Sequence, residues 1–316
     1  MEKTKTIYFI NGSSIGGGEI DGIIRANISN GIVVCLNTPC REIINLFQKL
    51  KINTFSLKEY ISHLFFSKNF EIEVHSNGFL RDLKYIFIIL LSFIIKLKNF
   101  RLILEVHSDP KSGLKKISHS LKFIIFIYEI YGLIFADKIR FVSHRQLSTF
   151  KYLSKKSYYI DPPISFLTRE ALFLKKNINI KKYDIIFVSR LTKSILLGDT
   201  KNKDFLFSLI KTLDNKKCKI LLISELGQND TEFSSNVEIK KPTLDIIYYL
   251  NQSKILIHPS IHEGYSLIVR EASLSGCKVV ASSAIAPEIQ NLKNVSIINN
   301  FKIENWLNNI EKLLKK

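Results

Sequence analysis

The sequence predicts an α/β protein made of two doubly wound domains, each built around a parallel sheet. Short runs rich in Ile, Val, Leu and Phe alternate with helix-like segments along both halves of the chain. These runs are apolar throughout, which is typical of strands covered by helices on both faces. The length of 316 residues is enough for about two domains, each with a substantial core.

In the first half, β-branched and aromatic side chains dominate the predicted strands, because such side chains fit a covered pleated surface. The strands are predicted at 6–10, 32–36, 72–75, 102–107 and 139–143, with helices near 19–29, 79–98 and 114–132.

The second half repeats this scheme. Strands are predicted at 184–189, 219–224, 254–260, 278–283 and 295–298, and helices at 266–276 and 303–316. Between the halves, segment 161–183 breaks the rhythm with two prolines and two Lys-Lys pairs. This composition is typical of a linker, so we predict domains at 1–165 and 166–316 that face each other across a cleft. Ligands of open α/β sheets bind at the carboxyl ends of the strands.

Net charge points to an anionic partner. The chain carries 46 Lys and Arg against 28 Asp and Glu, a net charge of +18. Residues 81–156 alone hold 15 basic and 5 acidic residues, and they are also rich in Ile, Leu, Phe and Tyr. This stretch has two interpretations: ordinary core helices with solvated lysines, or a patch that docks on an anionic membrane surface.

The cysteines and the hydropathy pattern favour a cytoplasmic protein. Cys35, Cys40, Cys218 and Cys277 form no CxxC pair, and a chain of this size needs no disulfides, so a reducing compartment is expected. The most apolar run, 85–95, has 11 residues, whereas a bilayer span needs about 20. We therefore expect no membrane span.

The segment HEGYSLIVREA at 262–272 contains two carboxylates, Glu263 and Glu271, between two apolar strand-like runs. Its first part is predicted to be a turn after a strand, followed by the start of a helix. Free amide groups and the helix dipole make such a place suitable for a phosphate, and Gly264 would let the backbone approach it. The plainer interpretation is that Glu263 caps the helix and Glu271 is a solvated surface residue.

Residues 258–289, HPSIHEGYSLIVREASLSGCKVVASSAIAPEI, resemble the donor-site signature of family 4 glycosyltransferases, which are retaining enzymes of the GT-B fold. The matching pattern has two glutamates separated by seven residues, a preceding Pro-Ser, and a following Gly, strand and Pro-Glu. The matching positions are Pro259, Ser260, Glu263, Gly264, Glu271, Ala272, Gly276, Val279, Val280, Ala281 and Glu288. One departure is Ser266-Leu267-Ile268, where the family usually has Gly-Leu-Pro.

The resemblance implies a set of donor-site residues in this chain. Arg190, after the strand at 184–189, would contact the diphosphate, together with either Lys201 or its competitor Lys193. His107 would line the active site and His75 would lie further from the chemistry, while Glu288 is expected to start a helix. The implied catalytic residues are His107 and Glu263, and the implied donor-binding residues are Gly16, Gly17, Gly18, Arg190, Lys201, Glu263, Gly264, Tyr265, Ser266, Leu267 and Glu271.

The reaction that the resemblance implies is sugar transfer from a nucleoside-diphosphate sugar. Negative charge grows on the leaving diphosphate, and cations and N–H dipoles stabilise it. Arg190, Lys201 and the helix after Gly264 would supply both, so we expect no metal and no cofactor. No DxD motif is present, and the spacing of His258 and His262 does not form HExxH.

Partners implied by the resemblance are a UDP- or GDP-sugar and a lipid-linked saccharide of surface polysaccharide synthesis. The acceptor and the membrane would contact the N-terminal domain, and Lys115, Lys116 and Arg145 would attract a lipid diphosphate acceptor. The resemblance therefore implies a peripheral location on the cytoplasmic face of the inner membrane, with residues 81–156 at the membrane surface. Two alternatives remain: a catalytically inactive GT-B partner subunit, and a nucleic-acid-binding protein. The second has only charge in its favour, because no nucleic-acid-binding motif occurs.

Overall fold

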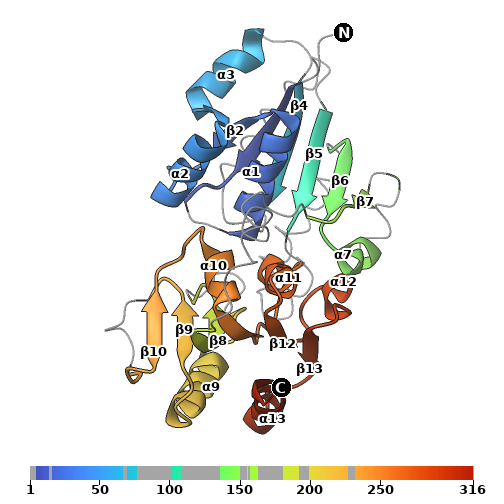
Figure 1. Ribbon diagram of the computed structural model, residues 1–316. Coiled ribbons are helices and arrows are strands. Elements are labelled where there is room, and N and C mark those ends of the chain that lie inside the picture. The colour runs from blue at the N-terminus through green and yellow to red at the C-terminus, as the bar shows by residue number, and fades with distance from the viewer. Residues whose placement is uncertain are drawn as a thin grey trace. The chain divides into compact units, whose positions relative to one another are not determined.

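The computed structural model of the protein describes residues 5–13, 16–66, 70–76, 101–107, 136–149, 155, 157–162, 181–191, 199–226 and 232–315. The chain divides into two compact units, Met1–Ser165 and Phe166–Lys316 (Figure 1). The predicted helices near 79–98 and 114–132 lie outside the described residues, as does most of the basic stretch 81–156. Lys193 also lies outside them.

The N-terminal unit contains a parallel sheet with strand order β3-β2-β1-β4-β5-β6-β7. Its strands are β1 (Lys5–Ile10), β2 (Ile32–Cys35), β3 (Asn53–Phe55), β4 (Phe70–Ser76), β5 (Arg101–Val106), β6 (Lys138–Phe141) and β7 (Ser157–Tyr159). Its described helices are α1 (Gly17–Ser29), α2 (Arg41–Leu50), α3 (Leu57–Phe66) and α7 (His144–Thr149).

The C-terminal unit contains a second parallel sheet, with strand order β10-β9-β8-β11-β12-β13. Its strands are β8 (Tyr183–Val188), β9 (Ile220–Ile223), β10 (Val237–Lys240), β11 (Ser253–His258), β12 (Lys278–Ser282) and β13 (Val295–Ile298). Its described helices are α9 (Lys203–Asn215), α10 (Ile246–Asn251), α11 (Leu267–Leu274), α12 (Pro287–Gln290) and α13 (Ile303–Leu314).

Both sheets reverse their strand order once, and in doubly wound sheets ligands usually bind at such a reversal. In the N-terminal sheet β1 lies between β2 and β4, and in the C-terminal sheet β8 lies between β9 and β11. Phe187 of β8 pairs with Ile257 of β11, so these neighbouring strands end at nearly the same level. The loops that follow them diverge to opposite sides, which makes this point the usual ligand position of a doubly wound sheet.

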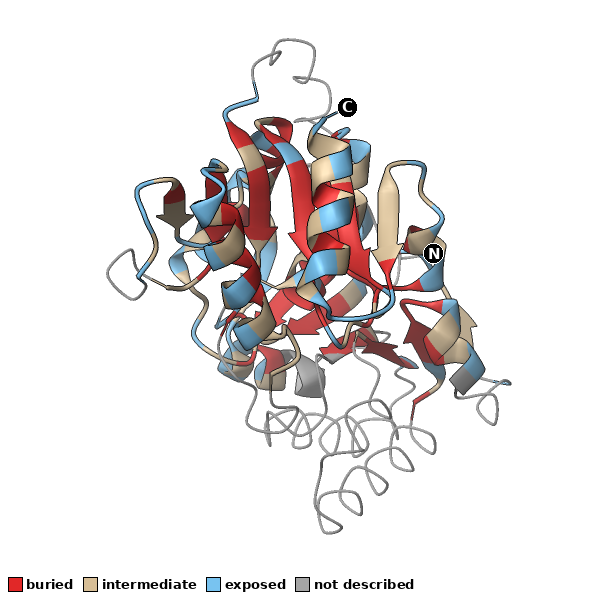
Figure 2. Cartoon of the chain, turned by 90° about the horizontal axis from the view of Figure 1, so that it is seen from below, coloured by how far each residue is buried: buried red, intermediate tan, exposed pale blue. Residues whose placement is uncertain are grey.

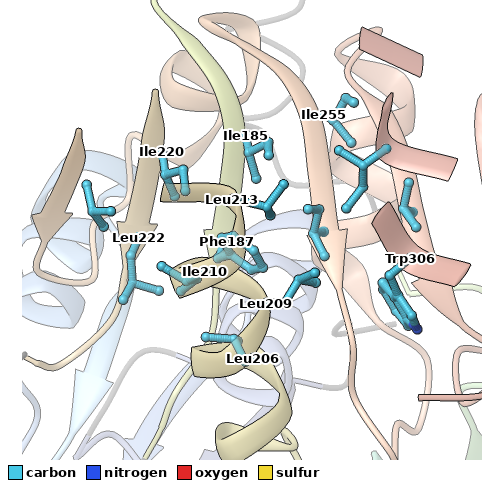
Figure 3. Packing of buried hydrophobic residues seen from close by; sticks show 14 of the residues in the cluster. Ile185, Phe187, Leu206, Leu209, Ile210, Leu213, Ile220, Leu222, Ile255 and Trp306 are labelled. Carbon is cyan, nitrogen blue, oxygen red and sulfur yellow. The ribbon is translucent and has the colours of Figure 1, made fainter. Parts of the chain in front are cut away.

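Helix α9 packs its apolar face on the C-terminal sheet. Leu206, Leu209, Ile210 and Leu213 recur at helical spacing, and each is at most 1 % exposed. Figure 3 shows these side chains against Ile185, Phe187, Ile220 and Leu222 of β8 and β9, with Trp306 of α13 nearby. This packing fixes the start of α9, and with it the loop that carries Lys201.

The strands form the buried interior of each unit, and the helices alternate between buried and exposed faces (Figure 2). The predicted fold class is confirmed: every strand predicted from an apolar run has a strand at its place. Three further strands, β3, β7 and β10, have only three or four residues each and are more polar, which is why the apolar-run criterion missed them. Among the described residues, no helix is long and apolar enough to cross a membrane.

Candidate active site

Two loops at the switch point of the C-terminal sheet are joined to each other. One precedes α9 and the other follows β11. The N–H of Ile261 donates to the carbonyl of Thr200 at 3.0 Å, and Lys201 forms an ion pair with Glu263. The loop before α9 is itself held by Asp199, whose carboxylate accepts the backbone N–H groups of Lys201 and Lys203. The two loops therefore form one structure that positions Lys201 and Glu263.

Glu263 is ionised, and its carboxylate contacts two side chains, Lys201 and His258. Burial by itself would raise the pKa of Glu263, but the charge of Lys201 and the hydrogen bond from His258 hold it well below its usual range. The ring nitrogen Nε2 of His258 lies 2.9 Å from Glu263 Oε1, and that carboxylate oxygen must accept. His258 was considered in the sequence only as a zinc ligand; in the structure it supports Glu263.

Helix α11 begins at Leu267, directly after Ser266. Ser266 has a φ of 83°, in the left-handed region that glycine adopts without strain. Its hydroxyl lies 3.0 Å from Nε2 of His258. The family pattern has Gly at this position, so the chain keeps the glycine-type backbone with a serine, and the serine side chain joins the His258–Glu263 group.

The remaining predicted residues of this unit lie around the same loop. Gly264 and Tyr265 are buried, and Tyr265 contacts Arg270, whose guanidinium carbon is 5.8 Å from the ring centre. Leu267 is the first residue of α11, and Glu271 lies one turn later, half-buried. Arg190 is exposed and follows β8 by two residues. Glu288 lies in α12, as predicted for a residue at a helix start.

The three glycines implied as donor-binding residues of the N-terminal unit lie at the start of a helix. Gly16 is extended and caps α1, while Gly17 and Gly18 already belong to the helix. The three glycines thus form the N-terminus of α1 after β1, where backbone N–H groups lack helical partners. The glycines therefore form a helix end that follows the carboxyl end of β1, an interior strand of the sheet.

The N-terminal unit also contains a buried polar cluster that the sequence analysis did not identify. The tripeptide EVH occurs twice, as Glu73-Val74-His75 in β4 and as Glu105-Val106-His107 at the end of β5. His75 pairs in register with Glu105, and Glu105 with Arg140 of β6. Because side chains alternate along a strand, these polar groups share one face of the sheet, under α1.

Arginines hold most of the carboxylates of this cluster. Arg140 donates to Glu73 at 2.7 and 3.0 Å and to Glu105 at 2.7 Å. Arg25 of α1 donates to Asp21 at 3.1 Å. Burial would raise the pKa of Glu73, but His75 and Arg140 bring it down to about 2.

Asp21 and His107 are shifted toward their neutral forms. Burial, together with the nearby charge of Glu105, raises the pKa of Asp21 to about 7. Burial lowers the pKa of His107 to about 3. Donor atoms of Asp21, His75, Glu105 and His107 lie within 4.8 Å of one another, a spacing at which a cation could be held. The same carboxylates, however, are already bound by Arg25 and Arg140.

Comparisons with known proteins find a matching family model and similar solved structures. Residues 182–316 match the family model of glycosyl transferases group 1. A search of curated protein sequences finds no match.

Solved structures similar to the chain have the GT-B fold. Alr3699/HepE of Anabaena, in complex with UDP and glucose, has a TM-score of 0.74 at 13 % identity, covering 99 % of this chain and 90 % of that one. A variant of TarM from S. aureus, in complex with Fondaparinux, alpha-GlcNAc-glycerol and UDP, has a TM-score of 0.68 at 12 % identity, covering 99 % and 93 %. A UDP-forming trehalose-phosphate synthase from Burkholderia xenovorans has a TM-score of 0.62 at 12 % identity, covering 99 % and 91 %.

The two parallel sheets and these neighbours define the class of protein: a two-domain α/β protein of the GT-B fold. With the family match at 182–316, the protein is a glycosyltransferase.

Proposed function

We propose that the protein is a retaining glycosyltransferase of family 4 that uses a UDP- or GDP-sugar. Its acceptor would be a lipid-linked saccharide in the synthesis of a bacterial-type surface polysaccharide: O-antigen, capsule or lipopolysaccharide. The observation that carries the donor part is the Lys201–Glu263 ion pair beside the start of α11, at the switch point of the sheet that matches the group 1 family.

The leaving group gains negative charge as the bond to the anomeric carbon breaks, and the cations of this loop region suit that charge. The Lys201 ammonium has three N–H donors and Glu263 uses one, so the others can reach a phosphate. Arg190 is exposed at the end of β8 and can bind phosphate with two parallel hydrogen bonds. The free amides at the start of α11 add a third attraction. No metal is needed in this scheme.

Glu263 would orient sugar hydroxyls in this mechanism. As an ionised carboxylate it accepts hydrogen bonds, and the partly buried ion pair with Lys201 fixes its place. Retention then requires no protein nucleophile: as the acceptor oxygen bonds to the anomeric carbon, the departing phosphate oxygen takes the acceptor's proton on the same face. Glu271 would hold the ribose hydroxyls, and His107 of the N-terminal unit is the second proposed catalytic residue.

The solved neighbours support UDP as the nucleotide of the donor, since the Anabaena and S. aureus proteins were both solved with UDP. A panel of UDP- and GDP-sugars tests the proposal, with release of nucleoside diphosphate measured for each donor. We expect one donor to be consumed, and NMR of the product to show the anomeric configuration of that donor. An inverted product would exclude family 4 chemistry.

The acceptor and the membrane location rest on the apolar, basic composition of residues 81–156. Flotation with vesicles containing anionic lipid at low salt tests the membrane contact, and neutral vesicles are the control. We expect binding to the anionic vesicles that weakens as salt rises. A protein that stays in the soluble fraction with anionic vesicles would contradict docking.

A catalytically inactive GT-B partner subunit remains the second candidate, favoured by the serine at the strained position 266. Binding of UDP or GDP without turnover of any sugar in the panel would support it. Binding of nucleic acid without binding of UDP or GDP would favour the remaining alternative, a nucleic-acid-binding protein.

A further inference from the structure

A single ring nitrogen of His258 contacts two oxygens in the C-terminal unit. Nε2 lies 2.9 Å from Glu263 Oε1 and 3.0 Å from the hydroxyl oxygen of Ser266. Glu263 Oε1 also pairs with the ammonium of Lys201, so it is an ionised acceptor. A lone pair on Nε2 would face this anionic oxygen at close range, whereas an N–H there is attracted by it. Nε2 of His258 therefore carries a proton, whether the ring carries one proton or two.

This proton fixes the role of the Ser266 hydroxyl. Because it faces an N–H, the oxygen of Ser266 can only accept from His258, and its own proton points elsewhere. Among the described residues, His258 is the only hydrogen-bond partner of this hydroxyl. Ser266 is 8 % exposed, and a buried O–H without an acceptor is costly. The C-terminal unit thus contains a buried donor that needs an acceptor.

The hydroxyl of Ser266 does not cap the eight-residue helix α11 either. A serine before a helix usually accepts from the second or third backbone N–H, but Ser266 forms no such bond. In the part of the chain that the structure describes, the N–H groups of Leu267 and Ile268 also have no acceptor. Two amides and one hydroxyl therefore lie together at the start of α11 as donors without an acceptor.

The surroundings of these donors suit an anion. The ammonium of Lys201 belongs to the same group of contacts, because it pairs with the carboxylate that His258 also contacts. The positive end of the α11 dipole adds to the attraction. Each oxygen of a diphosphate can accept several hydrogen bonds, so one such ligand can use the hydroxyl and the amides together.

We propose that the hydroxyl of Ser266 donates a hydrogen bond to a diphosphate oxygen of the bound nucleotide, and that His258 is the positioning residue that directs it there. This rests on the proposed function, since the ligand is the diphosphate of the sugar donor. The family usually has glycine at this position, and glycine has no side chain to donate. Ser266 therefore adds a donor of its own to the amides of the helix start.

Isothermal titration of the whole protein with UDP and with GDP tests the proposal. Ser266→Gly removes the hydroxyl and adopts the left-handed backbone without strain. If position 266 acted through its backbone alone, the glycine variant would bind at least as tightly as the wild type. We expect instead that its affinity falls about ten-fold, as for one hydrogen bond to a charged group. Ser266→Ala should show a similar loss.

Ser275→Ala is the matched control, at the other end of α11. Ser275 is also buried, and its hydroxyl donates to the carbonyl of Ala272 at 2.8 Å. This variant should bind the nucleotide with wild-type affinity. Thermal unfolding of each variant shows that it is folded.

A double-mutant cycle tests the part of His258. A nucleoside diphosphate carries no transferred sugar for Glu263 to orient, so the effect of His258 on its affinity should pass through Ser266. We expect His258→Phe to weaken binding in the wild type and to cause no further loss in Ser266→Gly. His258→Leu takes its place if the phenylalanine variant does not fold. Additive losses would refute the positioning role of His258.

The possible results separate this proposal from the proposed function. Wild-type affinity in Ser266→Gly would overturn the role of Ser266 and leave the proposed function intact. Absence of binding of either nucleotide by the wild type would overturn both. Weaker binding in Ser266→Gly, with no turnover of any nucleotide sugar by the wild type, would support the role of Ser266 and refute the proposed activity alone.

Discussion

Lys201 and Glu263 form an ion pair that joins the loop before α9 to the loop after β11. Their side chains are 25 % and 13 % exposed, so the pair is only partly accessible to water. The pair lies where two adjacent parallel strands end and their loops diverge. A lysine fixed in this way meets a phosphate without first losing the conformational freedom of its side chain.

Replacing Lys201 by Met is expected to destabilise the C-terminal unit. The variant keeps the apolar stem but removes the ion pair with Glu263, whose carboxylate keeps its hydrogen bond from His258. We expect a loss of about 1–3 kcal/mol in the free energy of unfolding, measured in urea. The matched control is Lys216→Met, which breaks the exposed pair with Glu311 and should cause no measurable change. Equal effects of both substitutions would contradict a structural role for the Lys201–Glu263 pair.

Ser266 should show the cost of a left-handed backbone without glycine. Both Ser266→Ala and Ser266→Gly lose the hydroxyl near His258, but only glycine relieves the strain of a φ of 83°. We therefore expect the Gly variant to be more stable than the Ala variant by about 1 kcal/mol. Thermal unfolding measures the difference. An Ala variant as stable as the Gly variant would show that the backbone at 266 is not strained.

Stability between pH 5 and 8 should depend on Asp21. Burial raises its pKa in the folded protein from 3.8 to about 7, so in this window the folded state binds a proton that the unfolded state has lost. Stability from this group is complete below pH 3.8 and is lost as pH rises through about 7.

Asp21→Asn mimics the protonated acid and removes this dependence. From pH 5 to 8 the wild type should lose about 2–3 kcal/mol relative to the variant. Other groups, such as His107, titrate in both proteins and cancel in the comparison. Asp204→Asn, at an exposed site in α9, should follow the wild type. Parallel pH curves for wild type and Asp21→Asn would refute a neutral Asp21.

Most strands could be predicted from the sequence because a strand covered on both faces is a continuous apolar run. The run at 254–260 therefore placed β11, and with it the turn that carries Glu263. The short strand β3, Asn53–Phe55, carries exposed polar residues at the edge of its sheet and gives no such signal.

The side-chain contacts in the polar cluster of the N-terminal unit were harder to predict, because they depend on the register between strands that are distant in sequence. Nothing local pairs His75 with Glu105, or brings Arg140 beside both glutamates. The repeated EVH tripeptide was the one local signal, since two glutamates within apolar strands are costly unless paired. Likewise, the sequence shows His258 only as the last residue of a strand. The contact of its Nε2 with Glu263 Oε1, at 2.9 Å, is visible only in the structure.

The central claim is that the C-terminal unit binds a nucleoside diphosphate between its basic side chains and the start of α11. Isothermal titration of the whole protein with UDP and with GDP tests it most directly. We predict one-to-one binding of at least one of them, with a Kd of about 10⁻⁶ M, or about −8 kcal/mol, and its loss in Glu271→Ala. Absence of binding by both nucleotides would contradict the account. So would an affinity in Glu271→Ala and Arg190→Ala that equals the wild-type affinity.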